Sequence, residues 1–174
     1  MKKATVTVRS LLRIGALAVV ALLLAPATLA AYEATIQAPN GVGDVVALTN
    51  AITEFNALPA TESGKIWLEP GVYDLRGVYM TSASHLDIRG TGNTTLFFAG
   101  KGSDRTKTLL IGGGETEAHR VIKAGGGSNY GWTTFSNMTV TGGYAANGEG
   151  GGIYGNHSTR YYDMIVTKIG RAHV

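Results

Sequence analysis

The chain has 174 residues, enough for one domain, with 25 glycines, no cysteine and only 16% charged residues. This composition excludes disulfides and cysteine zinc sites, and it argues against a disordered tail or a helical bundle. The net charge is +3, but residues 1–30 hold four of the 15 basic residues and no acid. The remaining 11 basic residues face 12 acidic ones, so we expect no nucleic-acid partner.

Residues 1–30 predict a secretory signal peptide. A positively charged start leads into an apolar run at residues 14–25, which small residues follow up to Ala30. The run is shorter than the roughly 20 residues that span a bilayer, although an uncleaved membrane anchor is the alternative. We therefore expect a secreted or cell-surface protein with no membrane span in the mature chain.

Residues 31–43 are expected to be a lead-in, and residues 44–57 predict the first regular element, a helix. Asp44 is placed to cap its N-terminus, and Pro59 follows its end. An apolar stripe at helical spacing consists of Val45, Leu48, Ile52 and Phe55. An amphipathic helix ahead of the first strand predicts a cap over the open end of a stack of strands.

Short strands separated by glycine-rich corners are predicted after the helix. They cover residues 65–68, 71–75, 86–88, 94–98, 108–111, 120–123, 135–141, 152–154 and 161–167. Residues 135–141 and 161–167 match in pattern at an offset of 26 residues, and residues 85–90 fall 52 residues before the first of these. A period in the twenties with alternating strands predicts an all-β solenoid rather than a sandwich.

The repeat also predicts which side chains face the interior. Two inward columns are expected, formed by Leu86, Met138 and Met164 and by Ile88, Val140 and Val166. Because side chains alternate along a strand, one outward column is expected, formed by His85, Asn137 and Asp163. Asp87 and Arg89 then lie side by side on the outer surface of one strand.

Two segments resemble a known fold family. Residues 64–73, GKIWLEPGVY, followed by Leu86-x-Ile88-x-Gly90, resemble the entry into the pectin-lyase-like superfamily of right-handed parallel β-helices. Residues 137–154 are similar to the repeats of secreted bacterial β-helix proteins related to polymorphic outer-membrane proteins. The resemblance implies a right-handed parallel β-helix with an N-terminal capping helix over residues 44–168. It leaves the activity open, because this superfamily hosts lyases, hydrolases, epimerases, tailspikes and non-catalytic adhesins.

Asp87, Arg89 and Asp163 are the candidate catalytic residues. An acid beside a base on an exposed sheet could abstract a proton next to a uronate carboxylate, with the arginine steering the anion. The alternative is that Asp87 and Arg89 form an ordinary surface pair. The Asn-Thr-Asp, Asp-Asp, Gly-His-Gly and Arg-Ile-Lys motifs of polygalacturonase-type hydrolases do not occur in this sequence.

Trp132 and Tyr130 are the candidates for stacking on sugar rings. Glu69 is expected to shape the turn before Pro70 or to lie exposed. Three further polar residues, Glu115, Glu117 and His119, are interpreted as part of a solvated loop, because their spacing matches no metal motif. No metal and no cofactor are expected.

Residues 169–174, IGRAHV, resemble a translated sequencing adapter. This predicts that the natural sequence stops at Thr167 or Lys168, in the middle of a domain; a natural C-terminus is the alternative. Two functions stay open. The preferred one is a non-catalytic, adhesin-like surface protein with a polysaccharide or cell-surface glycan as partner. The other is a polysaccharide lyase or glycoside hydrolase whose site lies on coils beyond residue 168.

Overall fold

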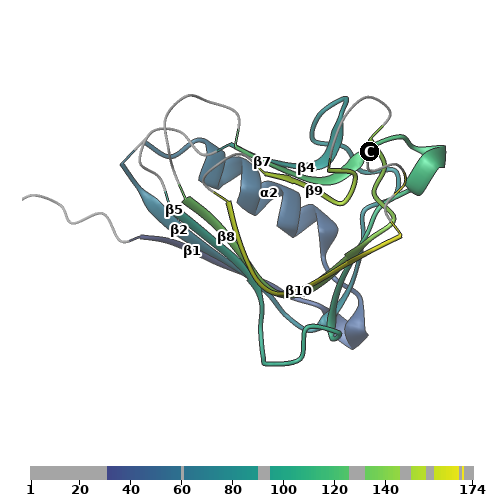
Figure 1. Cartoon of the computed structure of the whole chain (residues 1–174). Coiled ribbons are helices and arrows are strands. Elements are labelled where there is room, and N and C mark those ends of the chain that lie inside the picture. Colours follow the sequence, from purple (N-terminus) through teal and green to yellow (C-terminus); the bar gives the residue numbers. More distant parts are fainter. Residues whose placement is uncertain are drawn as a thin grey trace, which may run out of the picture. The chain divides into compact units, whose positions relative to one another are not determined.

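The computed structural model describes residues 31–59, 61–89, 95–125, 132–145, 150–155, 159–168 and 170 (Figure 1). All of its elements belong to the unit Ala31–Val174. The predicted signal peptide at residues 1–30 lies outside the described residues, as do Tyr130 and the adapter-like segment apart from Gly170. Among the described residues, no helix combines the length and the apolar character needed to cross a membrane.

The class is all-β, as expected, with one α-helix. The elements are β1 (Tyr32–Ile36), η1 (Pro39–Gly41), α2 (Val45–Asn56), β2 (Ser63–Leu68), β3 (Gly71–Asp74), β4 (Ser84–Ile88), β5 (Thr95–Gly100), β6 (Thr108–Ile111), η2 (Gly114–Thr116), β7 (Arg120–Ala124), β8 (Trp132–Thr141), β9 (Ile153–Gly155) and β10 (Thr159–Thr167). Each predicted strand is found within a few residues of its expected bounds. β1 lies in the segment that we expected to be a lead-in.

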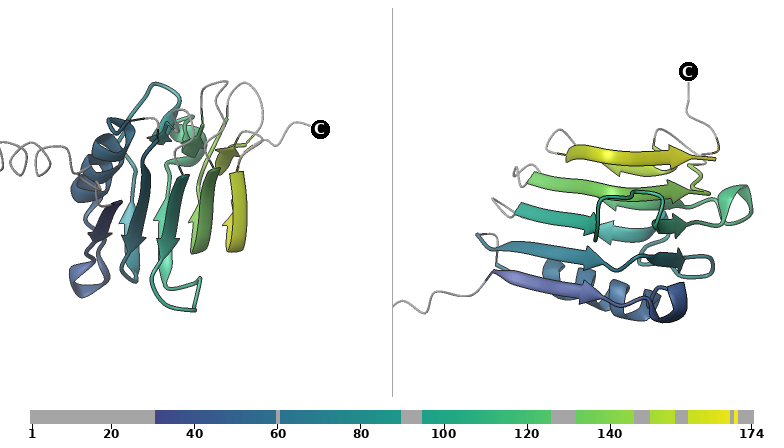
Figure 2. Two further views of the ribbon diagram at one scale, coloured as in Figure 1. Left: turned by 90° about the vertical axis from the view of Figure 1, so that its left-hand side faces the viewer. Right: turned by 90° about the horizontal axis from the view of Figure 1, so that it is seen from below.

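The strands are arranged in three rows. Within each row, neighbouring strands pair in parallel. The first row contains β1, β2, β5 and the N-terminal halves of β8 and β10. The second contains β3, β6 and the C-terminal halves of β8 and β10, and the third contains β4, β7 and β9. The chain visits the three rows in turn, so each circuit stacks on the previous one (Figure 2).

The predicted match between β8 and β10 is confirmed, because Met138 pairs with Met164 at an offset of 26 residues. The predicted stacking of residues 85–90 on these strands is wrong. β4 lies in the third row, where Leu86 pairs with Ile122. The circuits differ in length because loops such as residues 101–107 and 112–119 are inserted at the corners. A shared apolar pattern therefore does not identify strand partners.

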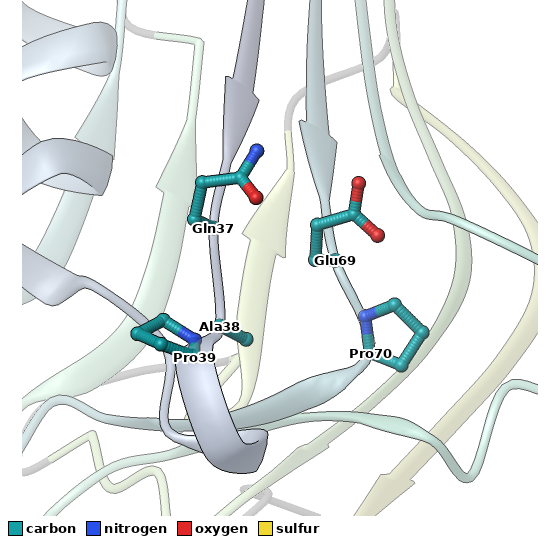
Figure 3. Close-up of a pocket in the computed structure, with 5 residues that line it drawn as sticks. All are labelled: Gln37, Ala38, Pro39, Glu69 and Pro70. Carbon is teal, nitrogen blue, oxygen red and sulfur yellow. The ribbon is translucent and has the colours of Figure 1, made fainter.

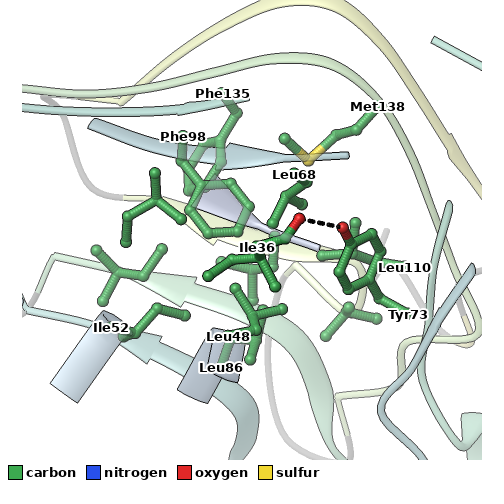
Figure 4. Packing of buried hydrophobic residues seen from close by; sticks show 14 of the residues in the cluster. Ile36, Leu48, Ile52, Leu68, Tyr73, Leu86, Phe98, Leu110, Phe135 and Met138 are labelled. Atoms are coloured by element: carbon green, nitrogen blue, oxygen red, sulfur yellow. Dashed lines mark hydrogen bonds between the residues drawn. The ribbon is translucent and has the colours of Figure 1, made fainter. Parts of the chain in front are cut away.

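Apolar side chains from all three rows meet in one core (Figure 4). Four of the six predicted inward residues are completely buried, namely Leu86, Ile88, Met138 and Val140. Met164 is half-buried against the core. Val166 pairs with the buried Val140, as predicted, but it is 40% exposed, so the expectation that it is buried is wrong. Both lie on β10, and no other described strand pairs with the free edge of β10.

An aromatic stack runs through the core in the first row. The rings of Phe98 and Phe135 meet edge to face with centroids 5.7 Å apart, and Tyr161 stacks on Phe135 at 5.9 Å. Phe98 and Phe135 are completely buried, whereas Tyr161 at the β10 end is 47% exposed. Such rings contribute most of the apolar area that stabilises a small core.

The helix α2 lies at the β1 end of the stack and contacts β1 and β4 (Figure 2). Asp44 caps it as predicted, because its side chain accepts a hydrogen bond from the backbone N–H of Ala47 at 2.8 Å. The helix buries one apolar face, formed by Leu48, Ala51, Ile52 and Phe55. Its position fits the predicted role of covering the apolar end of the first circuit.

Asn137 and Asp163 mark the corner at which β8 and β10 pass from the first row to the second. Both have φ of 53°, in the left-handed region that asparagine and aspartate tolerate better than most residues. The predicted outward column of His85, Asn137 and Asp163 is therefore wrong. Asn137 and Asp163 lie at the corner between two rows, whereas His85 is completely buried in the third row.

Candidate functional site

Side chains of the first row that point away from the core lie on one side of the sheet, called the outer face here. Its middle is covered, because Ala99 is completely buried and Ser136 is 8% exposed. Ile66 and Leu68 are completely buried, so alternation turns Lys65 and Trp67 outward. In register, the outer face consists of Glu33, Lys65, Phe97, Thr134 and Arg160 in one column, Thr35, Trp67, Ala99, Ser136 and Tyr162 in the next, and Ser63, Thr95 and Trp132 towards the strand N-termini. Adjacent members of a column lie about 4.8 Å apart, as strands of one sheet do.

Aromatic side chains lie at intervals across the outer face. Trp132 is 43% exposed and Tyr162 is 55% exposed. Trp67 and Phe97 are half-buried and pack edge to face, with ring centroids 5.1 Å apart. Their spread over β2, β5, β8 and β10 gives the surface several ring planes on one rigid sheet. The structure thus places the candidate Trp132 on a surface with further aromatic side chains.

Polar partners hold two of these rings in place. The guanidinium of Arg160 lies 3.9 Å from the ring centre of Trp132, a cation–π contact that fixes the indole. The indole N–H of Trp67 donates to Oε1 of Glu33 at 2.9 Å. A ring that is held before a ligand arrives loses little conformational entropy on binding.

A hollow of about 470 Å³ lies where β1 and β2 end, lined by Gln37, Ala38, Pro39, Glu69 and Pro70 (Figure 3). The backbone hydrogen bonds of the first row continue one residue beyond β1, β2 and β5. The N–H of Glu69 donates to the carbonyl oxygen of Ile36 at 3.0 Å, and the N–H of Lys101 donates to that of Leu68 at 2.8 Å. Gln37, Glu69 and Lys101 therefore extend the outer face by one more column. The ammonium of Lys101 pairs with the Glu69 carboxylate at 2.8 Å, so this end of the face carries charged groups beside two proline rings.

Glu69 also supports the turn that follows it, as expected. The hydroxyl of Tyr73 shares its one proton between two backbone carbonyl oxygens, that of Glu69 at 2.9 Å and that of Ile36 at 3.1 Å. Figure 4 shows the bond to Ile36. Burial raises the pKa of Tyr73, so this buried hydroxyl keeps its proton and stays a donor. The carboxylate of Glu69 remains directed towards the hollow and Lys101.

Asp87 and Arg89 lie side by side on β4 and just after it, as predicted, with Asp87 Oδ2 3.3 Å from Arg89 Nε. Asp87 is only 3% exposed, however, so it does not stand on an open sheet surface. Together with Arg89, it lines a hollow of about 240 Å³ whose other lining residues are Thr53, Asn56 and Met80. Sequence alternation placed Asp87 on the correct side of the strand but could not show what covers that side.

Asp163, the third catalytic candidate, lies apart from Asp87 and Arg89. It sits at the corner between the first and second rows, and its Oδ1 accepts from Nη1 of Arg105 at 2.9 Å. Arg105 belongs to the loop of residues 101–107, which Thr139 anchors by donating its hydroxyl to the Arg105 carbonyl oxygen at 3.0 Å. The structure therefore does not bring the three candidates together.

A second polar cluster surrounds His85, and sequence reasoning missed it. The ring of Tyr79 stacks on His119 at 4.3 Å and on His85 at 5.3 Å. Glu117 lies with its Oε2 3.4 Å from His85 Nε2. The pKa of Tyr79 is raised, first by burial and then by the charge of Glu117.

The interpretation of Glu117 and His119 as members of a solvated loop is therefore wrong. The loop folds back onto β4, and separations of 32 and 34 residues left no local signal for this contact. Within the described residues, no group of three or more histidine, aspartate or glutamate side chains is arranged to hold a metal ion.

No protein-family model matches the chain, and comparison with curated proteins and with solved structures gives no match either.

Proposed function

We propose that the protein is a secreted right-handed parallel β-helix that binds polysaccharide through its outer face, as a non-catalytic, adhesin-like surface protein does. The β-helix architecture is supported by the parallel strands, which the chain places in the three rows in turn. Crossover connections between parallel strands are right-handed in nearly all known cases. The signal-like residues 1–30 support secretion.

The observation that carries the proposal is the set of exposed rings on aligned strands. Trp132 and Tyr162 offer flat apolar surfaces, and the C–H face of a pyranose ring is a flat apolar partner for them. Lys65 and Arg160 lie in one column of the same face and supply donors for hydroxyl or carboxylate groups. A repeating polymer suits a surface whose own groups repeat from strand to strand.

The proposal is tested by the mobility of the whole chain in native gels that contain dissolved polygalacturonate, xylan or mixed-linkage glucan. We expect retardation by at least one polymer and its loss in Trp132→Ala. Tyr154→Ala is the matched control, because Tyr154 is similarly exposed at 39% but lies on β9 in the third row. Equal retardation of Trp132→Ala and the wild type would exclude the outer face as the binding surface.

A polysaccharide lyase or hydrolase is the second candidate, and the buried Asp87 favours it. A carboxylate that is 3% exposed beside Arg89 at the wall of a hollow is a suitable general base. If this candidate is correct, the protein shortens one of these polymers, and Asp87→Asn abolishes the release of new chain ends while retardation in the gel persists.

A further inference from the structure

The hydrogen bonds of His85 define its protonation state. Its Nδ1 lies 2.7 Å from the carbonyl oxygen of Val78, which can only accept, so Nδ1 carries a proton. The N–H of Gly113 donates to Nε2 at 3.3 Å, so Nε2 presents its lone pair. The ring in this arrangement is neutral, and it is completely buried.

Glu117 faces the same nitrogen without bonding to it. Its Oε1 accepts from the N–H of Gly77 at 2.9 Å. Its Oε2 is buried, has no hydrogen-bond partner among the described residues and lies 3.4 Å from His85 Nε2. A neutral Nε2 and a carboxylate oxygen are both acceptors, so neither satisfies the other. An unsatisfied buried acceptor is costly, and a proton on Nε2 would remove that cost.

The other groups around His85 leave Glu117 as the charge that acts most directly on it. The rings of Tyr79 and His119 stack on this cluster. Asp74 pairs with Arg76 at 2.5 Å, and its charge interaction with His85 is weaker than the one with Arg76. On the neighbouring strand β7, the guanidinium of Arg120 lies 5.1 Å from the Tyr154 ring centre.

We propose that His85 is a proton-operated switch that exchanges Gly113 for Glu117 as the partner of its Nε2. At alkaline pH Nε2 accepts from Gly113, and at acidic pH it carries a proton and donates to Glu117 Oε2. Histidine is the side chain that ordinarily changes charge between pH 5 and 8, and charge-assisted hydrogen bonds are the stronger ones. Because Glu117 also holds Gly77, the acidic state ties residues 112–119 more tightly to residues 75–81. The inference does not depend on polysaccharide binding.

The test is ¹H–¹⁵N spectroscopy of the whole chain between pH 8 and pH 5. We expect the His85 ring to carry its proton on Nδ1 alone at pH 8 and on both nitrogens at pH 5. The Gly113 amide should lose about fivefold in protection against exchange, corrected for the intrinsic rate, over the same range, as the loss of one hydrogen bond implies. A ring protonated on Nε2 alone at pH 8, or one that stays neutral at pH 5, would overturn the proposal.

Glu117→Gln tests the partner. Its amide keeps the shape of Glu117 and removes the charge, so the change at Gly113 should move to lower pH or vanish. Glu115→Gln is the matched control, because Glu115 is exposed on the same loop and should leave the change where it is. An unaltered Gly113 response in Glu117→Gln would contradict the proposal. If this variant does not fold, the ring tautomer of the wild type still decides.

Discussion

Asn56, the last residue of α2, donates a hydrogen bond from its side-chain amide to the backbone carbonyl oxygen of Asp87 at 2.8 Å. The same amide accepts from the backbone N–H of Arg89 through Oδ1, also at 2.8 Å. One side chain thus occupies the place of a neighbouring strand along the edge of β4. Unpaired groups on such an edge are otherwise available to other chains. The helix is therefore joined to the sheets by specific polar contacts as well as by its apolar face.

Asn56→Ala removes both bonds and leaves the part-buried Asp87 carbonyl and the exposed Arg89 N–H without this partner. We expect the free energy of unfolding to fall by about 1–3 kcal/mol, measured by urea denaturation. Asn50→Ala is the matched control, because Asn50 is exposed on the same helix and its loss should cost no more than about 0.5 kcal/mol. Equal effects of the two substitutions would show that the edge contact contributes no stability.

Phe97 and Phe98 are neighbours that the strand register turns to opposite sides. Phe98 is completely buried in the aromatic stack, whereas Phe97 is half-buried on the outer face. Phe98→Ala should destabilise the protein by about 3–5 kcal/mol, and Phe97→Ala should cost clearly less, because fewer of its contacts are lost. Thermal and urea unfolding of the two variants measures this difference. A larger cost for Phe97→Ala would mean that Phe97, and not Phe98, faces the core.

Asn137 has the left-handed backbone conformation, with φ of 53°, at the corner of β8. Asn137→Ala should lower the free energy of unfolding by about 1 kcal/mol, since a Cβ without a compensating polar side chain disfavours this conformation. Asn137→Gly should cost less than Asn137→Ala, because glycine adopts positive φ freely. If alanine is tolerated as well as glycine, the corner does not have the left-handed conformation.

Loss of the Tyr32 hydroxyl proton should lower the free energy of unfolding at high pH. Its pKa is raised to about 12 by burial and by hydrogen bonding to Glu54, against 10.0 for an ordinary tyrosine. The unfolded chain therefore loses this proton at lower pH than the folded chain does, and the stability that Tyr32 contributes below pH 10 is lost as the pH approaches 12. Tyr32→Phe should reduce this alkaline loss in urea denaturation between pH 9 and 12. A slope identical to that of the wild type would mean that Tyr32 is not held in this way.

Local pattern was sufficient to predict the helix and every described strand except β1. The apolar stripe from Val45 to Phe55 and the position of Asp44 gave the helix and its cap, and alternation gave most strands. β1 was missed because Tyr32, Ala34 and Ile36 alternate over only one short segment. Val166 is exposed although it pairs with the buried Val140, because no other described strand covers the second edge of β10.

Which strands pair within a row was not predictable, because the number of residues in each circuit varies with the loops. Leu86 pairs with Ile122 at an offset of 36 residues, while Met138 pairs with Met164 at 26. For the same reason the sequence identified Trp132 but could not show that Trp67 and Phe97 lie on the same surface. His85 and Glu117 could not be associated at all, since only the folded loop brings them together.

The most direct test of polysaccharide binding is to map which backbone amides respond to an oligosaccharide of the polymer that retards the protein. Titration of the whole chain followed by ¹H–¹⁵N spectroscopy should shift amides of the first row around Lys65, Phe97 and Arg160, together with the indole N–H of Trp132. The double variant Trp132→Ala/Tyr162→Ala should bind at least about tenfold more weakly, as the loss of roughly 1.4 kcal/mol implies. Shifts confined to the third row around Lys123 and Tyr154, or unchanged affinity in the double variant, would contradict the account.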